Sequence, residues 1–191
     1  MTNSVAEKAA RKRERLVAAA ADLLYRQGIE RTTLAHIAEA ADVRLGNVYY
    51  YFKTKDEILA AVTEAHVRQL ETRFATLERD HSGPKERLVA LAGSVAAQGA
   101  TIARFGCPYG TLGSELVKRA DPLAATLMGA LVGWAGRQFR ALGRADADDL
   151  AVEFVAAYQG SAVLASTLGQ PELMTRQARR IQEWITTLEE R

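Results

Sequence analysis

Apolar residues recur at intervals of three and four along this chain, and the breaks between such stretches carry glycine, proline or capping residues. No segment alternates apolar and polar residues with the period of two that a half-buried strand shows. The pattern therefore predicts an all-α fold of about nine helices. Short helices are expected within residues 33–55, where there are two, and over residues 108–119. Longer ones are expected over residues 7–27, 54–79, 84–103, 122–143 and 146–168, and a last helix follows the break at 169–171 and ends near residue 190.

Residues 33–55 predict a helix, a tight turn and a second helix. Ile37 and Ala38 place apolar groups on one face of the first helix. Asp42 interrupts that pattern with a residue that tolerates a left-handed or turn backbone. The second helix is expected to begin near Leu45. This arrangement is the helix-turn-helix pattern, in which the second helix lies in the DNA major groove.

The second helix would present hydrogen-bonding and basic side chains to DNA. Arg44 can make paired hydrogen bonds to guanine, and Asn47 can do so to adenine. Leu45 can contact a thymine methyl, whereas the lysines that follow the helix suit phosphates. A core position, in place of a DNA contact, stays open for Tyr49. The candidate DNA-binding residues are Thr33, Arg44, Leu45, Gly46, Asn47, Tyr49, Tyr50, Lys53 and Lys55.

Basic residues are concentrated at the N-terminal end. Residues 1–55 hold 10 Lys/Arg and 6 Asp/Glu, whereas the remaining residues hold 15 and 17, within a net charge of +2. A basic end on a nearly neutral body suits a polyanion, although a solvated charged helix would have the same composition.

Residues 10–65 resemble the N-terminal DNA-binding domain of the TetR family of transcriptional regulators. Asp42 stands where that family usually has glycine, and this difference affects only the expected conformation of the turn. The motifs that carry the resemblance are Gly28, Thr32-Thr33, Ile37-Ala38, Ala41-Asp42-Val43, Tyr49-x-x-Phe52 and Lys53-x-Lys55.

The resemblance implies a ligand-responsive regulator, most often a repressor that a small-molecule inducer releases from its DNA operator. It implies a three-helix DNA-binding domain in residues 1–53 and a ligand-binding and dimerisation bundle in residues 54–191. It also implies a homodimer through the last two helices. Ile181 and Ile185 belong to an apolar seam there, which could equally pack inside one chain. A twofold dimer requires a near-palindromic operator.

Aromatic and sulfur-containing residues collect in the middle of the chain. The resemblance implies an inducer cavity there, although core packing explains each of them as well. Cys107, in a bent Gly-Cys-Pro-Tyr-Gly segment, is a candidate sensor thiol or a plain buried side chain. The candidate ligand contacts are Arg104, Phe105, Cys107, Tyr109, Leu112, Met128, Leu131, Trp134, Tyr158 and Gln159.

Two other classes of protein compete with this interpretation: a helical binding protein whose N-terminal domain no longer reads DNA, and a small enzyme that uses Cys107. The chain shows no glycine-rich phosphate loop and no nucleophile elbow, and His36, His66 and His81 lack metal-ligand spacing. We therefore expect no enzyme activity, cofactor or metal. The single cysteine, the lack of a secretory signal and the lack of a membrane-length apolar run favour a cytoplasmic location.

Overall fold

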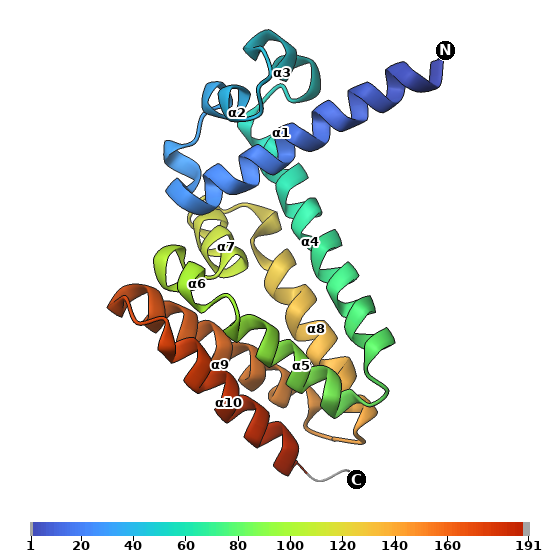
Figure 1. Ribbon diagram of the computed structural model, residues 1–191, viewed down its shortest axis with the longest axis vertical. Helices are drawn as coiled ribbons and strands as arrows, with labels where there is room; N and C mark the ends of the chain where they lie inside the picture. Colours follow the sequence, from blue (N-terminus) through green and yellow to red (C-terminus); the bar gives the residue numbers. More distant parts are fainter. Residues whose placement is uncertain (1, 189–191) are drawn as a thin grey trace.

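The computed structural model describes residues 2–188, and these residues form helices and connecting turns without a strand (Figure 1). The all-α prediction is confirmed. The molecule is elongated, and we call α1 to α3 the head and α5 to α10 the body (Figure 1). The elements are α1 (Thr2–Arg31), α2 (Leu34–Ala40), α3 (Leu45–Tyr51), α4 (Lys55–Asp80), α5 (Pro84–Ala96), α6 (Gly99–Phe105), α7 (Pro108–Lys118), the 3-10 turn η1 (Pro122–Ala125), α8 (Thr126–Ala141), α9 (Ala147–Leu168) and α10 (Glu172–Thr187).

The head packs its three helices and the start of α4 around one apolar core, in which Val48 of α3 is fully buried. The helix expected over residues 7–27 already begins at Thr2. It is broken at Gly28, whose φ of 81° lies in the left-handed region that glycine tolerates. The glycine break is where the sequence predicts it, and a further stretch of α1 continues to Arg31.

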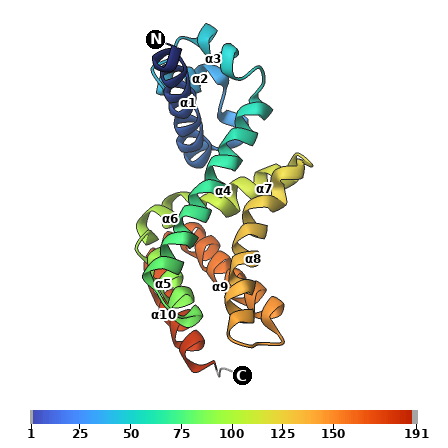
Figure 2. The ribbon, with the colours of Figure 1, turned by 90° about the vertical axis from the view of Figure 1, so that its right-hand side faces the viewer.

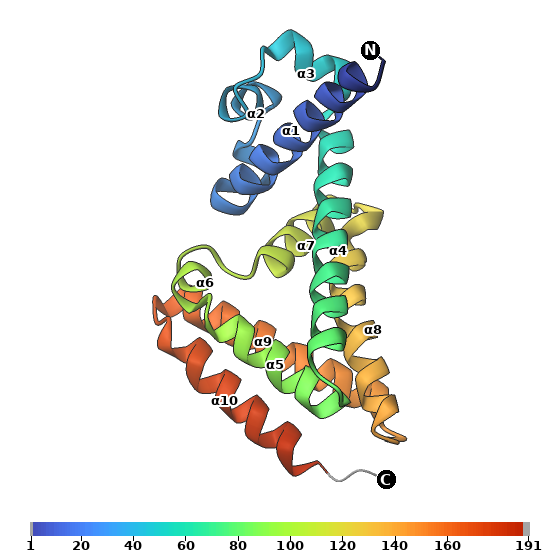
Figure 3. The same cartoon turned by 45° about the vertical axis from the view of Figure 1, so that its right-hand side comes forward.

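The long helix α4 runs from the head along the height of the body (Figure 3). Thr54 caps its start, because the backbone N–H of Glu57 donates to Thr54 Oγ1 at 3.2 Å. The Glu57 carboxylate in turn accepts at 2.7 Å from the backbone N–H of Lys53. Since one unbroken helix belongs to both parts, a displacement of its body end must move the head.

The helix expected over residues 84–103 is divided into α5 and α6. A β-carbon at Gly99 would lie 3.0 Å from the carbonyl oxygen of Pro171, so the bend brings the chain close to the start of α10. Among the described residues, no single helix is long and apolar enough to cross a membrane. The bent pair 84–96 and 99–118 reaches the length and hydropathy of a span when taken together.

Helix α10 packs against both α5 and α9 in the body (Figures 1 and 2). Ile181 and Ile185 of the expected dimer seam are buried in the core of this one chain. The seam therefore serves intramolecular packing. Helix α10 ends at Thr187, and its expected end at residue 190 lies outside the described residues.

Helix α8 holds the body end of α4. Trp134 stacks on Phe74 of α4 with ring centroids 4.7 Å apart, and its indole N–H donates to Glu78 at 2.9 Å. Aromatic stacking and a satisfied indole N–H together make this a rigid contact.

Candidate nucleic-acid interface and body cavity

A residue with a left-handed backbone conformation, Asp42, closes the turn between α2 and α3. Asp42 has a φ of 51°, a conformation that aspartate tolerates and glycine adopts freely. The backbone N–H of Val43 donates to the carbonyl of Ala38 at 2.9 Å, which reverses the chain. At the start of α2 the backbone N–H of His36 donates to Thr33 Oγ1 at 3.2 Å. The predicted turn is confirmed at this position, despite the replacement of the family's glycine.

Helix α3 has an inner and an outer face. Val48 is fully buried and Phe52 is 2% exposed, so these two side chains fix how the helix sits on the head. Tyr50 is 76% exposed and Tyr49 47% exposed, so Tyr49 does not take the core position that the sequence left open. The exposed side of the helix and its N-cap consists of Arg44, Leu45, Gly46, Asn47, Tyr49 and Tyr50.

Candidate phosphate contacts flank this outer face. Lys53 Nζ donates at 2.6 Å to the carbonyl of Tyr49, which holds its charge beside the end of α3. Lys55 is half-buried in the first turn of α4, and Thr33 is exposed at the N-cap of α2. These positions border the helix where a DNA backbone would pass.

Part of the basic stretch of α1 serves the head itself. The Arg13 guanidinium lies 5.2 Å from the centre of the Phe52 ring, and Arg15 Nη2 donates to the Asp42 carbonyl at 3.4 Å. Both contacts tie α1 to the helix-turn-helix. The N-terminal turns of α1 project beyond α2 and α3 (Figure 1).

The chain is similar to known bacterial regulatory proteins, chiefly in its N-terminal part. Residues 16–62 match the family of "Bacterial regulatory proteins, tetR family". The chain is 37% identical over 65 residues to the HTH-type transcriptional regulator TtgR of Pseudomonas putida, which is 34% of this chain and 31% of the relative. It is 28% identical over 82 residues to the HTH-type transcriptional repressor KstR2 of Mycolicibacterium smegmatis, which is 43% of this chain and 40% of the relative. The chain thus aligns with about a third of the length of TtgR.

The whole fold also has close structural counterparts. A TetR transcriptional regulator from Chloroflexus aurantiacus superposes with a TM-score of 0.82 at 22% identity, over 95% of this chain and 97% of that chain. Residues 16–62 therefore match the DNA-binding domain of the TetR family, and the relatives that the N-terminal part matches are named as transcriptional regulators. The described chain as a whole has the fold of a TetR transcriptional regulator.

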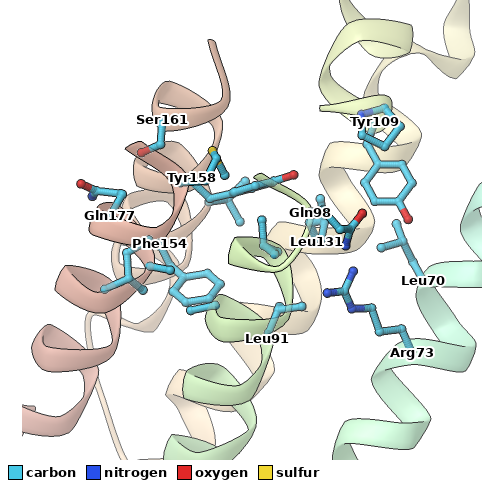
Figure 4. A pocket seen from close by; sticks show the side chains of 17 residues that line it. Leu70, Arg73, Leu91, Gln98, Tyr109, Leu131, Phe154, Tyr158, Ser161 and Gln177 are labelled. Atoms are coloured by element: carbon cyan, nitrogen blue, oxygen red, sulfur yellow. The ribbon is translucent and has the colours of Figure 1, made fainter. Parts of the chain in front are cut away.

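The body contains a cavity among α4, α5, α7, α8, α9 and α10 (Figure 4). It leaves about 50 Å³ for the centres of water-sized molecules, and about 770 Å³ of atom-free space when open solvent is included. Three of the predicted ligand contacts line it, namely Tyr109, Leu131 and Tyr158. Burial raises the pKa of both tyrosines, so both hydroxyls are protonated at neutral pH.

Three other predicted ligand contacts do not line this cavity. Trp134 is fully buried in its stack on Phe74. Phe105 packs against the ring of Tyr25 with centroids 5.5 Å apart, and the Arg104 guanidinium lies 4.9 Å from the Phe105 ring centre. Packing between α4 and α8, and between α6 and α1, uses these side chains instead, so a cavity lined by Phe105 and Trp134 was a wrong expectation.

The remaining predicted ligand contacts lie elsewhere in the body. Cys107, Met128 and Gln159 line a separate groove between α7, α8 and α9. The Tyr158 hydroxyl donates to Cys107 Sγ at 3.0 Å, and Gln159 Nε2 donates to the same sulfur at 3.4 Å. Leu112 lines a small recess against α1 and α4. Among residues 2–188, no cluster of His, Cys, Asp or Glu is arranged to hold a metal ion.

Sequence reasoning missed a charged cavity residue, Arg73. On α4, Leu70 and Phe74 are buried, and Arg73 lies on their side of the helix and lines the cavity. The sequence does contain an indication of this residue, because Arg73 is a single arginine on an otherwise apolar face of the helix. The aromatic residues, including Trp134, were predicted as ligand contacts in its place.

Proposed function

We propose that this protein is a DNA-binding transcriptional regulator, a repressor that leaves its operator when a small molecule occupies the body. The observation that carries the proposal is the outer face of α3. Val48 and Phe52 fix the helix on the head, and Arg44 and Asn47 are exposed on the opposite side. These are the side-chain types that read guanine and adenine edges. Relatives named a regulator and a repressor support the direction of control.

We propose a domain boundary between residues 1–53 and 54–191, at the capping residues that start α4. The head then binds DNA, and the body holds the ligand and the dimer contact. Because α4 is shared by the core of each part, it is the element through which a ligand would move the head.

The proposed homodimer uses the exposed face of α9 and the outer surface of α10. Val152, Val163, Leu164 and Leu168 are all more than half exposed, which is a large apolar surface for a chain on its own. At Gly160 an added β-carbon would meet no atom within 4 Å, so a partner helix could approach closely there. A twofold dimer places two heads on a near-palindromic operator, in the compartment that holds the chromosome, the cytoplasm.

Binding to the DNA upstream of the protein's own gene, measured by fluorescence anisotropy against random DNA, tests this function. Asn47→Ala should weaken specific binding by about 1–3 kcal/mol and relax specificity at one position. Lys55→Ala should weaken specific and random DNA alike and reduce the salt slope by about one. Lys118→Ala is the matched control, because Lys118 is exposed on the body.

Equal binding to all sequences by the unmodified protein would contradict a specific operator. Lack of binding to any DNA would favour the helical binding protein whose head no longer reads DNA. If Asn47→Ala weakened specific and random DNA by the same factor, Asn47 would contact the backbone and not a base.

A further inference from the structure

Arg73 brings a positive charge to the wall of the body cavity. Figure 4 shows its guanidinium extending from α4 toward the space between Leu91, Leu131 and Gln98. Its Nη2 donates to Ser94 Oγ, a neutral acceptor, which in turn donates to the Leu91 carbonyl at 2.7 Å. Among residues 2–188, no carboxylate forms an ion pair with Arg73.

Other arginines of the body form ion pairs with carboxylates, whereas within the described part of the chain Arg73 does not. Arg119 lies 2.7 Å from Asp56, and Arg140 lies 2.5 Å from Asp148. A guanidinium carries several N–H donors, and taking one out of water is costly unless an anion or hydrogen-bond acceptors compensate. At Arg73 one neutral hydroxyl does so, which leaves donors for a further acceptor.

The rest of the wall divides into apolar and hydrogen-bonding parts. Tyr109, Tyr158 and Gln98 supply hydroxyl and amide groups near the guanidinium end of the cavity (Figure 4). Burial raises the pKa of both tyrosines, and the positive charge of Arg73 acts against that increase. The apolar side chains of the wall are Leu70, Leu91, Leu131, Phe154, Met174 and Ile181.

We propose that the cavity binds an amphipathic carboxylate, whose anionic group pairs with Arg73 and whose hydrocarbon or aromatic part packs on the apolar wall. The proposal rests on the proposed role of the cavity as the inducer site, and names the chemical class of that inducer. An arginine–carboxylate pair can be bidentate, which fixes the ligand's orientation as well as adding affinity.

Such a ligand would also connect the elements that a switch needs. Arg73 lies on α4, the helix that continues into the head, whereas Tyr158 lies on α9. Tyr109 of α7 contacts the ring of His66 of α4, with centroids 5.5 Å apart. Because the free space is small, a ligand of several carbons must widen the cavity, and the displaced wall includes α4.

The test compares matched acids and alcohols by thermal shift and isothermal titration calorimetry. Octanoate, decanoate and phenylpropanoate are the probes, and octanol, decanol and phenylpropanol are their uncharged counterparts. The acids should raise the melting temperature more than the alcohols, because a ligand that binds only the folded state stabilises it. In Arg73→Met the affinity for the acids should fall roughly tenfold to hundredfold, while that for the alcohols changes little.

Arg68→Met is the matched control. Arg68 is on the same helix but exposed, 3.8 Å from Glu64, so its loss should leave the preference for acids intact. Both variants are first checked for an unchanged melting temperature without ligand. A preference for acids that survives in Arg73→Met, or its absence with every pair of probes, overturns the proposal.

The same samples separate this inference from the proposed function. Binding of acids that depends on Arg73 but leaves DNA affinity unchanged would support the carboxylate site and contradict its role in regulation. Release of DNA by a neutral compound in both the unmodified protein and Arg73→Met would support regulation and overturn the carboxylate.

Discussion

The carboxylate of Glu115 in α7 accepts a hydrogen bond of 2.5 Å from the backbone N–H of Ile29, near the end of α1. A β-carbon at Gly28 would lie 2.8 Å from Glu115 Oε1, so the glycine leaves the space that this contact needs. Nearby, the Tyr25 hydroxyl donates at 2.7 Å to the carbonyl of Gly106, just before α7. The head is therefore joined to the body by side chains as well as by α4.

We expect Glu115→Ala to lower the free energy of unfolding by about 1–3 kcal/mol, since it leaves a partly buried N–H without its acceptor. Glu115→Gln keeps an acceptor oxygen and should cost less. Urea unfolding measures both, with Glu71→Ala, an exposed change on α4, as the control. If Glu115→Ala were as stable as that control, the contact would not hold head to body.

The helix-turn-helix could be predicted because each of its determinants is local. Thr33 caps α2, Asp42 closes the turn, and Thr54 caps α4, each through partners within a few residues. These steps depend on neighbouring residues in the chain, so the order of residues alone indicates them.

The cavity depends on contacts between distant parts of the chain, and there the prediction was partly wrong. Trp134 was predicted as a ligand contact because it is a large aromatic residue. It packs instead on Phe74, which is 60 positions away in the sequence. Ile181 and Ile185 have the spacing of a dimer seam, yet they are buried within one chain. Helical periodicity shows that a face is buried but not which partner buries it.

Because Ile181 and Ile185 are buried within one chain, we expect the dimer contact on the exposed apolar face of α9 instead. Val163→Glu should produce monomers that unfold at nearly the same urea concentration, because Val163 is 61% exposed in the single chain. Analytical ultracentrifugation measures the dimer, and DNA affinity should fall with it. Ile185→Glu is the contrast, since a charge at a fully buried position should unfold the body. A Val163→Glu protein that remains dimeric would place the interface elsewhere.

The single cysteine can be tested as a sensor. Cys107 is 4% exposed and its sulfur accepts two hydrogen bonds, but it lines the groove between α7 and α9, which offers a reagent a route. Treatment with N-ethylmaleimide should weaken DNA binding, since a bulky adduct must displace α7, whereas Cys107→Ser should bind DNA normally and not respond. Mass spectrometry follows the adduct. The same response in Cys107→Ser would assign Cys107 to packing.

The contact between α4 and α7 also predicts a pH dependence of stability. His66 is half-buried against the ring of Tyr109, and burial lowers the pKa of His66, although its hydrogen bond to Gln69 acts in the opposite direction. Its pKa is therefore lower in the folded than in the unfolded state. Between these two values the unfolded state binds more protons, so the free energy of unfolding rises with pH.

The contribution of His66 should be fully present above the unfolded pKa of about 6.5 and be lost as the pH falls toward the lower folded value. Urea unfolding at intervals between about pH 5 and pH 8 measures it. His66→Gln should flatten the slope in this window, because the side chain no longer titrates. His36→Gln is the control, since His36 is exposed on α2. An equal slope in His66→Gln and in the unmodified protein would mean that another group produces the dependence.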